Sequence, residues 1–163
     1  CATSYISFLL AEPADFLSDV IYDADMADVA SVQVHIDGET DLNMELDSEN
    51  KQYTVNDIDV AALGTDAVDA LTTLYDNLTG LTTSTLDLTD NVPMEEEPEI
   101  TLTYNLKDGT TEVITFLAKD KESYYVLRNG EYSGFLAKRT AFTSRNGILE
   151  FYHRLEKTIG MTE

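Results

Sequence analysis

The 163-residue sequence contains no tryptophan, one cysteine, three prolines and only ten lysine and arginine residues. Because Cys1 is the only cysteine, an internal disulfide bond is excluded, and cysteine pairing gives no information on the redox compartment. No run of about 18 apolar residues occurs, so we expect no membrane-spanning helix within these residues. No basic start followed by an apolar stretch is present, so we also expect no signal peptide.

Cys1 has two interpretations, since the chain does not begin with methionine. A terminal cysteine can be the lipid-bearing residue of a mature bacterial lipoprotein. Such a cysteine normally leads into a flexible tether, whereas here a strand is predicted from about Tyr5. We therefore favour a boundary at which a longer chain was cut, and lipidation of Cys1 stays open as the alternative.

Basic residues are nearly absent from the first two-thirds of the chain. Residues 1–106 contain 23 acidic residues and one basic residue, Lys51, whereas residues 107–163 contain nine basic and eight acidic residues. A body this negative repels phosphate, so we expect no binding of nucleic acid. Runs of charge usually face water, and we expect a solvating surface. Recruitment of cations or of a basic partner is the alternative.

Alternating apolar residues predict strands in the first half of the chain, at residues 32–36, 42–46 and 53–55. An amphipathic helix follows, with apolar residues at helical spacing between Val68 and Leu78, and Gly80 is placed to end it. A further strand is predicted within residues 81–88.

The same order of elements is predicted again in the last third. Strands are expected at residues 100–106, 113–118, 124–128 and 132–137. Asn129-Gly130 is the strongest signal for a two-residue hairpin turn. A last helix places Ile148, Phe151, Leu155 and Ile159 on one face. The predicted fold is α+β: a repeated antiparallel β-meander of three to four strands, followed by one helix that packs on the sheet.

Four segments follow from this pattern. Residues 29–90 and 99–163 each form one unit, and residues 91–98 form an acidic, proline-containing linker between them. Residues 1–28 are predicted to be the strand and helix that end a preceding unit, with the helix running from Pro13 to about residues 23–28. Tyr5-Ile6-Ser7-Phe8-Leu9 supports this, because it is similar to Tyr132-Ser133-Gly134-Phe135-Leu136. A repeating chain favours a scaffold or binding surface over an active site.

These patterns resemble an uncharacterised bacterial family called domain of unknown function 4340. The residues that carry the resemblance are Val32–Ile36, Tyr53-Thr54-Val55-Asn56, Leu106-Lys107-Asp108-Gly109-Thr110, Tyr124-Tyr125-Val126, Asn129-Gly130, Tyr132 and the last helix. The resemblance implies an extracytoplasmic protein held to the membrane by an anchor outside this chain. It also implies an association with transporter components. The family has no established catalytic residues that could be transferred to this chain.

Few side chains are candidates for chemistry. His35 and His153 are the only histidines, and we expect both on the surface, without a nucleophile such as Ser144 beside them. Two acidic clusters were considered as calcium sites: Asp23, Asp25 and Asp28, and Asp37, Glu39 and Asp41. Neither fits an EF-hand loop, since the twelfth residue from Asp37 is Ser48 instead of glutamate, and we expect neither to bind calcium.

Two other short patterns are assigned no function. Asn77-Leu78-Thr79 matches a glycosylation sequon but lies in a predicted helix. Lys138, Arg139 and Arg145 form a small basic group that is expected to meet an acidic neighbouring unit, with little effect on stability.

The sequence thus predicts no catalytic residue, no metal ligand and no cofactor. It favours a non-enzymatic module of a membrane-anchored bacterial envelope protein, which is extracytoplasmic and acts as a scaffold or binds a protein or glycan partner. The alternative is an acidic domain that binds cations or another ligand.

Overall fold

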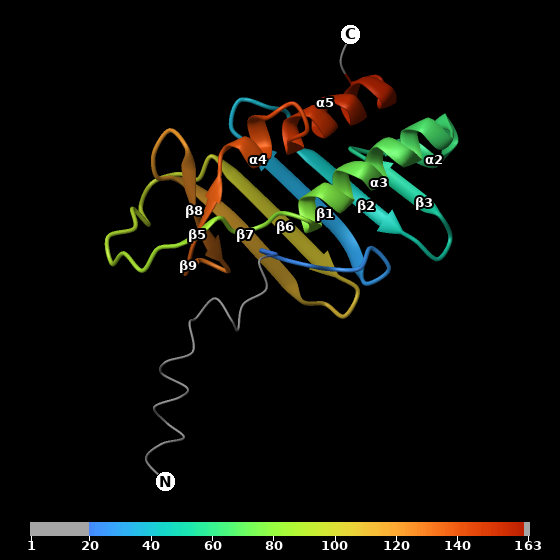
Figure 1. Cartoon of the computed structure of the whole chain (residues 1–163). Helices are drawn as coiled ribbons and strands as arrows, with labels where there is room; N and C mark the ends of the chain where they lie inside the picture. The colour runs from blue at the N-terminus through green and yellow to red at the C-terminus, as the bar shows by residue number, and fades with distance from the viewer. Residues whose placement is uncertain (1–19, 162–163) are drawn as a thin grey trace, which may run out of the picture.

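The computed structural model describes residues 20–161, and these residues form an α+β fold (Figure 1). Nine antiparallel strands make one sheet in the order β4-β3-β2-β1-β6-β7-β8-β9-β5. The strands are β1 (Val29–Ile36), β2 (Leu42–Asp47), β3 (Gln52–Val55), β4 (Ile58–Asp59), β5 (Thr85–Leu86), β6 (Ile100–Leu106), β7 (Thr111–Ala118), β8 (Ser123–Arg128) and β9 (Glu131–Lys138). The helices are α2 (Val60–Leu63), α3 (Thr65–Thr79), α4 (Thr140–Thr143) and α5 (Ile148–Ile159). None of these helices is both long and apolar enough to span a bilayer.

The chain repeats one order of elements. Strands β1 to β4 are followed by a short helix and a longer one, and strands β6 to β9 are followed by another such pair. The predicted meander followed by a helix is therefore present in both halves. Strands β1 and β6 pair antiparallel at the centre, so the two meanders extend outward from this pair to opposite edges of one sheet. The short strand β5 then crosses to the far edge and pairs with β9.

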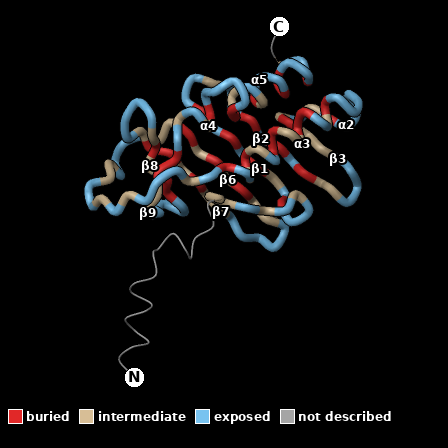
Figure 2. Tube along the Cα trace, in the orientation of Figure 1, coloured by how far each residue is buried: buried red, intermediate tan, exposed pale blue. Residues whose placement is uncertain are grey.

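The main core lies between the sheet and the helices. Apolar residues alternate along the strands, and one set, which includes Val32, Met44 and Leu102, is buried beneath α3 and α5. Helix α3 adds Leu71, Leu74 and Leu78, and the two long helices contact each other. Figure 2 shows buried residues along the strands of the sheet and along the helices that cover it.

Residues 20–28 correct the prediction of a helix that ends near residues 23–28. Val20 bridges to Thr82, and residues 21–28 contain no helix. Tyr22, Ala24 and Met26 pack against the core while the residues between them are exposed, which is the two-residue period of an extended chain. Figure 1 shows this segment crossing the sheet on the same side as the helices. The strand predicted from Tyr5 lies outside the described residues.

Residues 87–99 contain no helix or strand. The strand predicted within residues 81–88 is short, since only Thr85–Leu86 forms β5. After β5 the chain is held to the far edge of the sheet. The Tyr132 hydroxyl donates a hydrogen bond of 2.7 Å to the Asp87 carbonyl, and Lys119 pairs with the Asp87 carboxylate.

The hairpin predicted at Asn129-Gly130 is confirmed. These two residues join β8 to β9, and both have positive φ, 51° and 82°. The turn is also fastened to β7, since the Asn129 amide donates to the Val113 carbonyl at 2.8 Å and the Asn129 Oδ1 accepts from the Val113 amide at 2.9 Å. A two-residue turn with positive φ at both positions matches the twist of the strands that it joins.

Replacing Gly130 with valine is expected to lower the free energy of unfolding by about 1 kcal/mol or more. A Cβ at this position would meet no atom within 4 Å, so the cost arises from the left-handed backbone alone. Gly130→Asn is the matched control, because asparagine tolerates this conformation at a cost of a few tenths of a kcal/mol, by an order-of-magnitude estimate. Urea denaturation measures both variants. Equal stability of the valine and asparagine variants would contradict the expected backbone strain at position 130.

Candidate functional site

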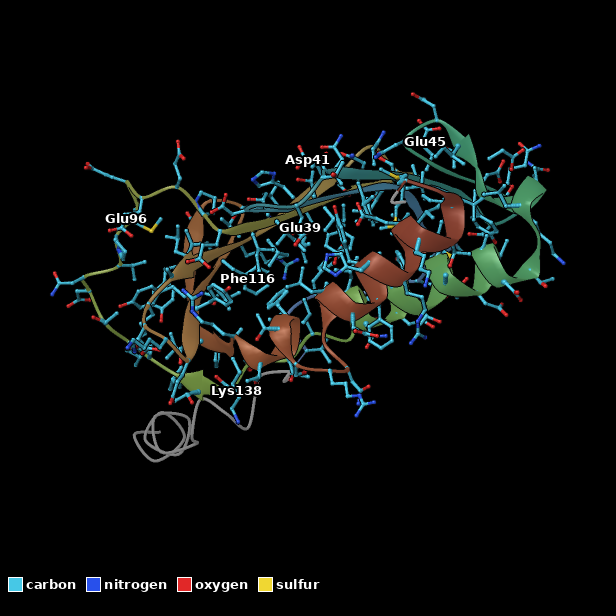
Figure 3. The ribbon with its side chains drawn as sticks, turned by 90° about the horizontal axis from the view of Figure 1, so that it is seen from above. Glu39, Asp41, Glu45, Glu96, Phe116 and Lys138 are labelled. Atoms are coloured by element: carbon cyan, nitrogen blue, oxygen red, sulfur yellow. The ribbon has the colours of Figure 1, made fainter. Side chains whose placement is uncertain are left out.

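The face of the sheet that points away from the helices is polar over β1, β2, β3 and β6. Alternation along these strands places the following side chains on it: Ser31, Gln33, His35, Asn43, Glu45, Asp47, Gln52, Thr54, Thr101, Thr103 and Asn105. We call this surface the open face. Figure 3 shows Asp41 and Glu45 on this side of the sheet and Phe116 on the side of the helices.

Two hollows lie on the open face. The larger, of about 540 Å³, is lined by side chains that include Gln33, His35, Asn43 and Thr101. The smaller, of about 380 Å³, is lined by Ser31, Glu45, Asp47, Gln52 and Thr54 together with Ala30 and Leu46. The pairs Ser31–Glu45 and Gln33–Asn43 follow each other along β1 and β2, so the hollows form one stripe.

Carboxylates give the open face its charge. Asp41 borders the larger hollow, and Glu45 and Asp47 border the smaller. No lysine or arginine occupies an outward position of β1, β2, β3 or β6. Thr54 donates a hydrogen bond of 3.1 Å to Glu45, and Asn56 donates one of 2.9 Å to the Asp41 carbonyl. These contacts hold polar groups in place across the strands, although the surface as a whole faces water.

His35 lies on the open face, as its position in the strand pattern predicted. Its Nδ1 is 2.6 Å from the Asp41 Oδ1, and both side chains are more than half exposed. An exposed pair of this kind contributes little to stability. His35 adds a second polar group to the rim of the larger hollow.

A second histidine pair lies at the edge of the helical layer. The His153 Nε2 is 2.9 Å from the Glu39 Oε2, although 114 positions separate the two residues in the sequence. Glu156, one helical turn beyond His153, brings a third ligand atom, and the three atoms all lie within 4.8 Å of one another. Among residues 20–161 this is the single group of three or more histidine, cysteine and acidic side chains that is close enough to hold a metal ion.

An ion pair between Glu99 and Arg139 closes the other end of the core. The Arg139 guanidinium donates to both Glu99 carboxylate oxygens, at 2.8 Å and 2.9 Å, and stacks on the Tyr124 ring at 4.3 Å. The Tyr124 hydroxyl donates to Glu99 at 3.0 Å. These hydrogen bonds, that from Arg139 first, hold the pKa of Glu99 below its ordinary value. Burial, with the contact to Glu99, raises the pKa of Tyr124 to about 12.

The two acidic clusters considered for calcium do not converge. Asp41 and Glu39 point to different histidines, so the group with Asp37 splays around its turn. The Asp25 carboxylate caps the backbone at Ala27, with an N–O distance of 2.9 Å.

The remaining sequence candidates are also placed. Asn77 lies within α3, where its side chain donates to the Thr73 carbonyl at 2.7 Å, so the sequon is helical as predicted. Within the basic group, Arg139 is turned toward Glu99, whereas Lys138 and Arg145 are exposed. In the described part of the chain, both imidazoles hydrogen-bond to carboxylates, His35 to Asp41 and His153 to Glu39.

Sequence reasoning missed Glu156 and the grouping of Glu39 with His153. The spacing of His153 and Glu156, three residues apart on an amphipathic helix, is a local signal that places both on one helix face. No such signal connects Glu39 to this helix, because the β1–β2 turn and α5 meet only after the sheet has formed.

Comparison with known proteins adds no relative: no protein-family model, no curated protein and no solved structure matches this chain.

Proposed function

We propose that this chain is a non-enzymatic binding module that receives a basic segment of a protein partner on its open face. We place it in an extracytoplasmic, membrane-anchored protein of the bacterial envelope, in contact with a transporter complex. The resemblance to the domain of unknown function 4340 family is the support for this location. The support for binding comes from the surface itself.

The single observation that carries the proposal is the contrast between the two faces of the sheet. One face is covered by α3, α5 and residues 20–28, whereas no described element lies over the open face at β1 and β2. The uncovered strip has two adjoining hollows, which Asp41, Glu45 and Asp47 border. A surface of this charge attracts a partner that presents lysine or arginine, and long-range attraction speeds the encounter.

A protein is favoured over a glycan for a reason of composition. Sugar rings commonly stack on aromatic side chains, and no aromatic residue occupies an outward position of β1, β2, β3 or β6. The aromatic pair Tyr125 and Tyr132 lies at the other end of the sheet, with its rings 5.6 Å apart. Hydrogen-bonding amides and carboxylates suit extended peptide segments that lie along strands.

Photo-crosslinking in cells that produce the protein tests the proposal. A photoreactive amino acid at Gln33 or Glu45 should capture one defined partner protein, whereas the same amino acid at Asp69, on the exposed side of α3, should not. The captured partner is then purified. Its affinity should fall at least about tenfold when Asp41 and Glu45 are both replaced by lysine, and salt should weaken the wild-type complex.

The matched control changes Asp66 and Asp69 of α3 to lysine, which alters the net charge by the same amount on the opposite layer. This variant should bind the partner within about twofold of the wild type, because exposed charges far from the contact are screened. Equal losses in both double variants, or crosslinks from α3 alone, would show that the open face is not the binding surface.

A further inference from the structure

We propose that Glu39, His153 and Glu156 form a binding site for one divalent transition-metal ion, with Zn²⁺ as the best match. The site is separate from the open face and does not depend on the proposed partner. It joins the turn between β1 and β2 to helix α5, two segments from opposite ends of the described chain.

The fold brings three ligand atoms within 4.8 Å of one another. His153 and Glu156 share a face of α5 because residues three apart are neighbours on a helix. Glu39 reaches them from the β1–β2 turn, where its amide donates a hydrogen bond of 3.0 Å to the Ile36 carbonyl. A zinc ion with bonds of about 2.0–2.1 Å holds its ligands about 3.3 Å apart. The His153–Glu39 pair, at 2.9 Å, must open only slightly, and both side chains are partly exposed.

Glu156 supplies an independent indication that a cation belongs here. Only 3% of this residue is exposed, and within the described residues its carboxylate makes no hydrogen bond. The side chain is largely enclosed, and a cation beside its carboxylate would offset the cost of that burial. A metal ion would hold the carboxylate in its charged form.

Tyr152 supports the same conclusion. Its hydroxyl is buried and has no hydrogen-bond partner in the described structure. Tyr152 precedes His153 on α5, and its ring lies 5.6 Å from the His153 ring. An unpaired buried hydroxyl is costly, and a polar group next to it would offset that cost. A metal ion with a bound water would supply both a cation and a donor.

The ligand types decide which ion fits. Calcium takes six to eight oxygen ligands, and magnesium keeps several waters in an octahedron, so neither ion favours an imidazole. One imidazole with two carboxylates suits zinc and its neighbours among the transition metals. Three protein ligands leave a fourth position for water or for a group from another molecule.

Metal titration of the full chain tests the proposal. After treatment with a chelator, ZnCl₂ should bind with a stoichiometry of one and should raise the melting temperature until saturation. CaCl₂, and NaCl at matched ionic strength, should give no saturable shift beyond screening. Co²⁺ should give the intense visible bands of a low-coordinate nitrogen and oxygen site. The titration is repeated in Cys1→Ser, so that the free thiol cannot supply the binding.

His35→Ala and His153→Ala are the decisive pair. Both remove an exposed histidine that pairs with a carboxylate, but only His153 has a third ligand beside it. We expect His153→Ala and Glu156→Gln to weaken Zn²⁺ binding at least about tenfold, and His35→Ala to leave it within about twofold. If Glu156→Gln folds poorly, Glu39→Gln gives the same test from an exposed loop.

Three results would overturn the site. The first is the absence of saturable binding of one Zn²⁺ ion. The second is an equal loss in the His35 and His153 variants, which would indicate general attraction to an acidic surface. The third is an equal, saturable stabilisation by Ca²⁺, which would indicate a site made of carboxylates elsewhere.

Discussion

Replacing Phe116 with alanine is expected to lower the free energy of unfolding by about 3–5 kcal/mol. Phe116 is fully buried, and Figure 3 shows it between the sheet and the helices. Its ring packs edge-on against Phe142 of α4 at 4.9 Å and against Tyr124 of β8 at 6.0 Å. The substitution therefore removes apolar contacts and leaves a cavity at the point where α4 rests on the second meander.

Urea denaturation followed by circular dichroism measures this loss, and the slope of the transition should stay unchanged. Leu88→Ala is the matched control, because Leu88 is 73% exposed and its truncation creates no cavity. The control should change stability by no more than about 0.5 kcal/mol. A loss below about 1 kcal/mol in Phe116→Ala would mean that these three rings do not form a tightly packed core.

Replacing Arg139 with methionine is expected to cost about 2 kcal/mol at neutral pH. The change removes two charge-assisted hydrogen bonds to Glu99 and leaves that partly buried carboxylate with Tyr124 alone. Methionine keeps much of the apolar contact with the Tyr124 ring, but the change also removes hydrogen bonds of 2.7 Å to the Asp120 carbonyl and 3.1 Å to the Tyr124 hydroxyl. Arg145→Met, at an exposed position, makes the same change in net charge and should be nearly neutral.

The effect of Arg139→Met should depend on pH. Because the pKa of Glu99 in the folded protein lies below its ordinary value of 4.5, the stabilisation is fully present above that value. It is lost as the pH falls through the lowered folded-state pKa, where Glu99 becomes protonated. The difference in unfolding free energy between wild type and variant should therefore shrink from about pH 6 to about pH 3. A difference that stays constant over this range would exclude ionised Glu99 as the partner.

The secondary structure of this chain follows from the spacing of its apolar side chains and from the residue types at its turns. Val32, Val34 and Ile36 alternate with polar residues, and only a strand with one buried face satisfies that pattern. Gly80 ends α3, and Asn129-Gly130 tolerates the positive φ values that a two-residue hairpin requires. Because these signals depend on neighbours within a few residues, the α+β class and most elements were predictable.

At residues 20–28 the spacing of apolar residues alone gave the wrong prediction, a helix. Val20 and Ile21 continue the spacing of a helix that was predicted from Pro13, but Tyr22, Ala24 and Met26 alternate. The extended form prevails because Tyr22 stacks on the ring of Tyr104 at 4.7 Å, and the Ile21 amide donates to the Leu81 carbonyl. Tyr104 and Leu81 are both distant in the sequence from this segment, so a local sequence pattern cannot predict these contacts.

The sequence by itself determined the strands, the helices, the acidic first two-thirds and the absence of an internal disulfide. Only the tertiary structure decided that β1 pairs with β6, which merges the two meanders into one sheet, and that β5 crosses to β9. It alone brought Glu39 to His153 and left the open face without a covering helix. Whether two strands that are far apart in the sequence pair with each other depends on how much apolar surface both strands bury. That amount is set only once the whole sheet has assembled.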